Sequence, residues 1–169
     1  STAIELIEGD LVSDLQAGVV MDFVAGETFA SLLRRVAAPS LEVRGRRATA
    51  CRAKGAAQMP WVEDTGERLR MAVGAALAFK TLQRRSLVVV YVRGGEGREG
   101  DWRGVLALAS KFELPMIFVV LPKAGGRERL DGANVSAFAK SDMIPCMPVD
   151  AAGALAVYGV PHESMERVR

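Results

Sequence analysis

The sequence is poor in the residues that form disulfide frameworks, zinc sites and histidine-dependent catalytic centres. It holds two cysteines, Cys51 and Cys146, far apart and outside any C-x-x-C spacing, and one histidine, His162. Isolated cysteines predict a reducing compartment and no disulfide framework, and neither cysteine has a metal partner at ligand spacing. His162 follows Pro161 in a predicted C-terminal helix without a recognisable nucleophile motif. We therefore predict a surface helix residue at position 162.

Long apolar runs and a strong charge of one sign are also missing. No stretch approaches the roughly 18 apolar residues that a membrane span needs, and the N-terminal STAIELIEGD has no basic region followed by an apolar stretch. The formal net charge of the 169 residues is only +2. The basic stretch Arg44–Arg47 lacks interleaved aromatic residues and predicts a solvated loop. These features predict a cytoplasmic protein that binds neither membranes nor nucleic acid.

Helical spacing of apolar residues dominates the first half of the chain. It predicts helices over Asp10–Val24, Glu27–Val36 and Gly66–Thr81. Between the last two, residues 38–65 are rich in Arg, Gly and Pro and predict an irregular basic loop. The centre of the third helix, Met71–Ala78, is made largely of small residues, which permit close helix packing.

Strands and helices alternate in the second half. Continuous apolar strands separated by helices predict a parallel central sheet that is covered on both faces. Pro161 is expected to kink the last helix or divide it in two. We expect one α/β domain over residues 1–169. The predicted elements after the third helix are the strands Leu87–Val92, Met116–Leu121 and Ile144–Val149, the helices Trp102–Glu113 and Ala151–Val168, and the loop Lys123–Gly132.

A glycine-rich turn follows the first of these strands. Its glycines have the spacing G-x-G-x-x-G: Gly95, Gly97 and Gly100. A dinucleotide site also requires an acid about 20 positions later, and Phe118–Pro122 contains none. Three acids in the turn would repel a phosphate: Glu96, Glu99 and Asp101. The turn is therefore interpreted as a tight strand-to-helix connection in which Asp101 caps the helix.

Three segments carry a resemblance to a known family. GERLRMAVGAALAFK, GREGDWRGVLALASKFELPMIFVV and VDAAGALAVYGVPHESMERVR resemble the alpha subunit of thiamine-diphosphate-dependent 2-oxoacid dehydrogenases, the pyruvate, branched-chain and acetoin dehydrogenase group. DLVSDLQAGVVMDFVAGETFASLL is similar to a further segment of that subunit, more weakly. The resemblance implies a three-layer α/β/α fold of the pyrophosphate-domain type, here truncated. It also implies thiamine diphosphate with Mg²⁺ as the family cofactor, and a homodimer or a complex with a beta-type subunit.

Most of the functional residues of that family are absent at the matching positions. The family's GDG turn falls on Arg93–Gly95, so that Gly94 replaces the aspartate that binds Mg²⁺, and the family's asparagine pair falls on Pro122-Lys123. The family's Tyr-Arg-Asp-His motif falls on Leu15–Gly18. Thr65-Gly66 matches the place where the backbone meets the aminopyrimidine ring. The positions that match the cofactor site are Arg93, Gly94, Gly95, Glu96, Lys123, Thr65 and Gly66.

Three hypotheses about function remain open from the sequence. In the first, the chain is a non-catalytic or scaffolding relative of the alpha subunit that binds no thiamine diphosphate with Mg²⁺, and it has no catalytic residue or metal ligand. In the second, it is an active oxidoreductase subunit that binds the diphosphate without metal, through Arg93, Lys123 and the backbone of Gly94–Gly97. In the third, the same loop binds another small anionic ligand.

Overall fold

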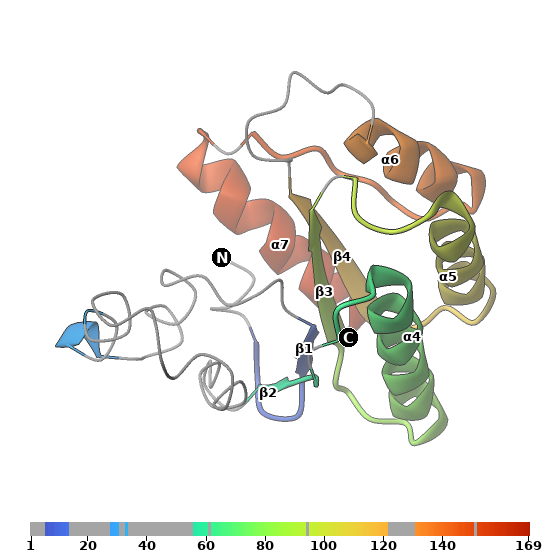
Figure 1. Ribbon diagram of the computed structural model, residues 1–169. Helices are drawn as coiled ribbons and strands as arrows, with labels where there is room; N and C mark the ends of the chain where they lie inside the picture. Colours follow the sequence, from blue (N-terminus) through green and yellow to red (C-terminus); the bar gives the residue numbers. More distant parts are fainter. Residues whose placement is uncertain are drawn as a thin grey trace.

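Parallel strands connected by helices form the described part of the protein. The computed structural model describes residues 6–13, 28–30, 33, 56–60, 62–93, 95–121, 131–150 and 152–169 (Figure 1). Within these ranges, β3 and β4 alternate with helices, which confirms the predicted α/β class. In chain order, the elements are β1 (Leu11–Ser13), β2 (Ala57–Gln58), α4 (Thr65–Thr81), β3 (Val88–Arg93), α5 (Glu99–Lys111), β4 (Met116–Leu121), α6 (Asp131–Ser141) and α7 (Ala154–Val168).

The described sheet has four parallel strands in the order β2-β1-β3-β4. The longest pairing joins β3 and β4, from Val88 opposite Met116 to Arg93 opposite Leu121. Val88–Val92 of β3 are all buried. A continuous apolar run suits a strand with helices on both of its faces, and the predicted parallel sheet is confirmed.

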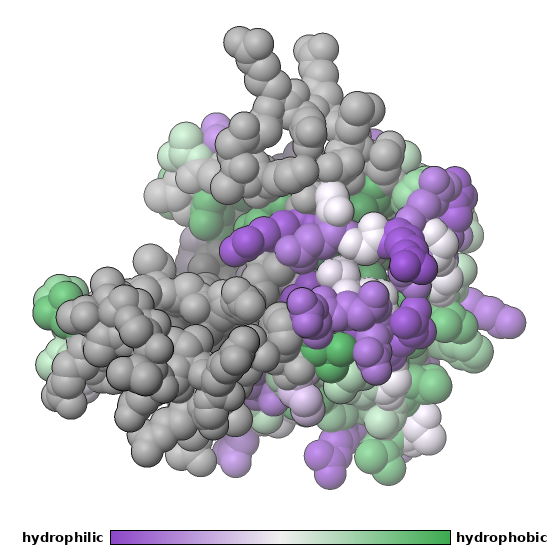
Figure 2. Space-filling model, in the orientation of Figure 1, coloured by the Kyte–Doolittle hydropathy of each residue, from purple (hydrophilic) through white to green (hydrophobic). Residues whose placement is uncertain are grey.

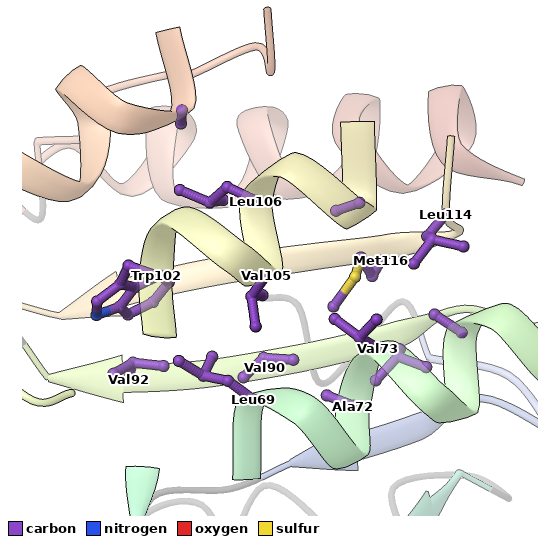
Figure 3. Packing of buried hydrophobic residues seen from close by; sticks show 14 of the residues in the cluster. Leu69, Ala72, Val73, Val90, Val92, Trp102, Val105, Leu106, Leu114 and Met116 are labelled. Atoms are coloured by element: carbon purple, nitrogen blue, oxygen red, sulfur yellow. The ribbon is translucent and has the colours of Figure 1, made fainter. Parts of the chain in front are cut away.

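One face of the sheet packs against α4 and α5. Figure 3 shows Leu69 of α4 and Trp102 of α5 beside Val90 and Val92 of β3. Trp102 also meets the Phe118 ring of β4 edge-on, with centroids 5.9 Å apart and planes at 64°. This larger core cluster fixes where α4 and α5 begin relative to the end of β3.

The opposite face packs against α7. Val89 and Tyr91 of β3, with Leu87 directly before the strand, share a cluster with Met165 of α7, which is 1% exposed. Pro161 lies inside α7 without dividing it, so the predicted division in two is wrong. In Figure 1, α7 lies across the sheet from α4 and α5.

The first predicted helix is wrong where the structure describes it. Leu11–Ser13 form β1 because Leu11 N–H donates to the Leu87 carbonyl (2.9 Å) and the strand pairs in parallel with β3. Residues 14–24 of that prediction lie outside the described residues. Phe29, Ala30 and Leu33 are helical, in agreement with the second predicted helix at those positions.

The predicted irregular loop 38–65 is partly wrong. Ala57–Gln58 form β2, which pairs with β1, and α4 already begins at Thr65. Tertiary pairing supplies the partner for β2, which is too short to produce a sequence pattern of its own. Residues 38–55 and 61 lie outside the described residues.

The predicted strand Ile144–Val149 does not form. Its alternating burial resembles a strand, since Ile144 and Cys146 pack against the larger core cluster, but Pro145 and Pro148 lack the N–H that a strand ladder needs. Helix α6 occupies Asp131–Ser141, for which the sequence predicted no helix. It includes the last two residues of the predicted loop Lys123–Gly132, whose remainder lies outside the described residues.

Two predicted helix starts shift for local reasons. Arg98 rather than Asp101 is the N-cap of α5, and Asp101 lies in its first turn. Helix α7 begins at Ala154 with Gly153 as N-cap, because the Asp150 carboxylate accepts from Ala152 N–H (2.9 Å) in a turn before the helix. Among the helices that the structure describes, none is long and apolar enough to cross a bilayer.

Candidate functional site

The carboxyl end of β3 brings together the start of α4 and the start of α5. Ligands of open α/β sheets bind at the carboxyl ends of strands, so this edge is the candidate functional site. Figure 2 shows hydrophilic side chains gathered over the N-terminal ends of α4 and α5. The Asp64 carboxylate caps α4 by accepting from Glu67 N–H at 2.7 Å, which fixes the first turn of that helix.

A buried arginine joins α4 to the turn after β3. The Arg68 side chain is only 7% exposed, and its Nη2 lies 3.1 Å from Glu96 Oε2. The same Nη2 donates to Thr65 Oγ1 at 3.4 Å. The backbone N–H of Arg93 also donates to Glu96 Oε2, at 3.4 Å. One oxygen of Glu96 therefore accepts from a side chain of α4 and from the end of β3.

A second ion pair connects the start of α5 to α4. Arg70 Nη1 lies 2.6 Å from Asp101 Oδ1, and Arg70 also lies 3.8 Å from Asp64. Position 66 has to be small for this contact, because a Cβ on Gly66 would lie 2.5 Å from Asp101 Oδ2. Gly66 thus serves the approach of a carboxylate from the neighbouring helix.

The pairing explains the acids that the sequence placed in a phosphate-like turn. Glu96 balances Arg68 and Asp101 balances Arg70, while Glu99 pairs with Arg103 within α5 (2.8 Å). These acids connect elements or stabilise a helix.

The backbone of the turn is held by Trp102 and by a glycine. Trp102 Nε1–H donates to the Glu96 carbonyl at 2.9 Å. Gly97 has φ +84°, and a Cβ there would lie 3.0 Å from Trp102 Nε1 and 3.3 Å from Thr65 Cγ2. A side chain at position 97 would meet both backbone strain and a steric contact. The turn is therefore fixed independently of the Glu96 side chain.

Replacing Gly97 with alanine is expected to lower the free energy of unfolding by about 1–3 kcal/mol. Gly100→Ala is the matched control, since Gly100 is helical and a Cβ there meets no atom within 4 Å. It is expected to be neutral or to stabilise by up to about 1 kcal/mol. Urea unfolding of both variants measures the difference, and equal effects would show that position 97 does not constrain the turn.

The structure brings together some of the predicted site residues. Thr65 and Glu96 share Arg68 as a partner, and Gly66 contacts α5. Arg93 ends β3 with an exposed side chain, and Gly95 lies in the turn with φ +84°. Gly94 and Lys123 lie outside the described residues.

Sequence reasoning missed Arg68 and Arg70. Both follow the cap at Asp64 in the first two turns of a predicted helix, which is the only signal that could have drawn attention to them. Their partners lie 28 and 31 residues away in the sequence. His162 lies on α7 with its side chain 45% exposed, in agreement with the predicted surface helix residue, and its Nε2 lies 3.8 Å from Glu166 Oε1.

The buried Arg68 guanidinium at this edge already has a carboxylate partner in Glu96. Among the described residues, no three His, Cys, Asp or Glu side chains gather as a metal site.

No protein-family model matches this chain, and no curated protein matches it.

Proposed function

We propose that the chain is a non-catalytic, alpha-subunit-like scaffold protein of the thiamine-diphosphate-dependent 2-oxoacid dehydrogenase type. The proposal includes a pyrophosphate-domain type of fold and a cytoplasmic location. It is supported by the three resembling segments, and by a parallel sheet with helices on both faces. The observation that carries the non-catalytic part is the 3.1 Å ion pair between Arg68 and Glu96.

The ion pair argues against a diphosphate for an electrostatic reason. Two like charges about 4 Å apart repel by roughly 4 kcal/mol near a protein surface, where the effective dielectric constant is about 20. Glu96 would be such a neighbour, and the position of the family's metal-binding aspartate holds Gly94. Without Mg²⁺ to bridge the charges of Glu96 and the diphosphate, binding of the cofactor is disfavoured.

A scaffolding role requires a surface for another subunit. The outer face of α4 presents Gly74, Leu77 and Ala78 to solvent, with Leu77 41% exposed. Small residues allow the backbone of a second helix to approach closely.

We propose that the chain forms a homodimer or binds a beta-type subunit. Gel filtration and a pull-down with a beta-type subunit test this, and a monomer that captures no such subunit would contradict it.

Calorimetric titration with thiamine diphosphate, with and without Mg²⁺, tests the absence of the cofactor. We expect no binding tighter than a Kd of about 1 mM in either condition, which corresponds to about −4 kcal/mol. Micromolar, Mg²⁺-dependent binding would contradict the proposal and favour an active subunit with a beta-type partner. Micromolar binding without Mg²⁺ would favour metal-independent diphosphate binding by Arg93 and Lys123.

A gain-of-function variant provides the complementary experiment. Gly94→Asp combined with Lys123→Asn restores oxygen ligands at the two positions that match the family's metal ligands, and Mg²⁺ prefers such ligands. Addition of Glu96→Ala removes the opposing carboxylate. Mg²⁺-dependent binding of thiamine diphosphate by this triple variant would support a degenerate cofactor site.

A further inference from the structure

The carboxylate of Glu96 is held in the manner of a bound anion. Its Oε2 accepts from the guanidinium of Arg68 at 3.1 Å and from the backbone N–H of Arg93 at 3.4 Å. A guanidinium together with a backbone N–H at a strand-to-helix turn is a donor set that binds oxyanions, phosphate in particular.

The two partners differ in their access to solvent. The Arg68 side chain is 7% exposed, whereas the Glu96 side chain is 34% exposed. A buried guanidinium requires a counter-charge, but Glu96 reaches it from the surface and can swing into solvent by rotation of its side chain. The Arg68 guanidinium is therefore fixed in the core, whereas the Glu96 carboxylate can be replaced by another anion.

The backbone at position 96 does not depend on this carboxylate. The Glu96 carbonyl accepts from Trp102 Nε1–H at 2.9 Å, and the Glu96 N–H donates to the Arg93 carbonyl at 3.0 Å. Removal of the Glu96 side chain should leave the turn and the Arg93 N–H in place. It would then leave space for a small ligand beside Arg68.

We infer that Arg68 and the backbone N–H of Arg93 form a binding site for a phosphate group, and that Glu96 closes this site as an internal anion. The ligand class is inorganic phosphate or the phosphate of a monoester, which has to displace Glu96. Two further cations of the same turn, Arg93 and Arg98, have exposed side chains and would attract such a ligand. The inference goes beyond the scaffold proposal, which concerns thiamine diphosphate and Mg²⁺ and not a single phosphate group.

The test compares the melting temperature of Glu96→Ala in sodium phosphate, sodium acetate and sodium chloride at equal ionic strength. In chloride we expect a fall of about 3–8 °C relative to the unmodified chain. In 50 mM phosphate we expect a recovery of about 3–6 °C, the shift for a Kd of roughly 5 mM. Recovery in acetate but not in phosphate would overturn the assignment to phosphate.

Two control variants separate this site from the general stabilising effect of phosphate salts. Glu99→Ala removes an exposed acid of the same region that pairs with Arg103, and it should respond to phosphate as the unmodified chain does. Arg68→Met combined with Glu96→Ala removes the cation and should lose the extra response. An equal phosphate shift in all of these proteins would overturn the inference. Failure of Glu96→Ala to fold in any of the salts, while the double variant folds, would overturn it too.

Discussion

Replacement of Asp10 with alanine is expected to lower the free energy of unfolding by about 3–5 kcal/mol, since it breaks a buried ion pair on one side. Asp10 lies directly before β1 and is 0% exposed. Its Oδ1 accepts from Leu87 N–H at 3.0 Å, and its Oδ2 accepts from Ile7 N–H at 3.0 Å and from Arg169 Nη2 at 2.7 Å. Alanine would leave the buried N–H of Leu87 and the partly buried N–H of Ile7 without this acceptor.

Asp150→Ala is the matched control for this result. Asp150 is exposed and accepts locally from Ala152 N–H at 2.9 Å, so its loss should change the free energy of unfolding by no more than about 0.5 kcal/mol. Arg169→Met, alone and combined with Asp10→Ala, completes a double-mutant cycle that isolates the charge pair. Guanidinium chloride unfolding measures all four. A loss below about 1 kcal/mol for Asp10→Ala would refute a role of this carboxylate in joining β1, β3 and the end of α7.

Replacement of Trp102 with alanine is the second change with a large expected effect, a loss of about 3–5 kcal/mol in the free energy of unfolding. The side chain is 3% exposed. It fills the space between β3, β4 and α5 and packs edge-on against Phe118. Alanine would leave a cavity there and remove the hydrogen bond from Nε1 to the Glu96 carbonyl.

Trp102→Phe separates the packing from the hydrogen bond. Phenylalanine keeps most of the apolar volume and loses the N–H donor, so we expect a smaller loss of about 1–2 kcal/mol. Thermal and urea unfolding compare the two variants. If Trp102→Phe costs as much as Trp102→Ala, the hydrogen bond to the turn, and not the packing, would be the main contribution of this residue.

The elements that the sequence predicted well are those with long, unambiguous patterns. Strand β4 matches its prediction in full, β3 is shifted by one residue, and α4 begins one residue earlier than expected. Each is an apolar run or a helical repeat, so the pattern within the segment itself indicates which of its residues are buried. The same reasoning failed at β1, where three residues gain their strand geometry from pairing with β3.

The location of the candidate site was predictable from the sequence, but the ion-pair partners within the site were not. The turn after β3 and the start of α4 drew attention through Glu96, Thr65 and Gly66, all of which lie at this edge. The arginine that organises them was not identified, because nothing around Arg68 in the sequence indicates that its side chain is buried. Only the packing of α4 against β3 and α5 places that guanidinium next to Glu96.

The sequence by itself determined the α/β class and the parallel sheet, because a strand such as Val88–Val92 is apolar on both faces and has to be covered on both. It also determined that acids follow this strand, which argued against a dinucleotide site. Only the tertiary structure decided what those acids do. Glu96 and Asp101 find their arginines 28 and 31 residues away, and such pairs depend on the relative positions of two helices, which no local pattern specifies.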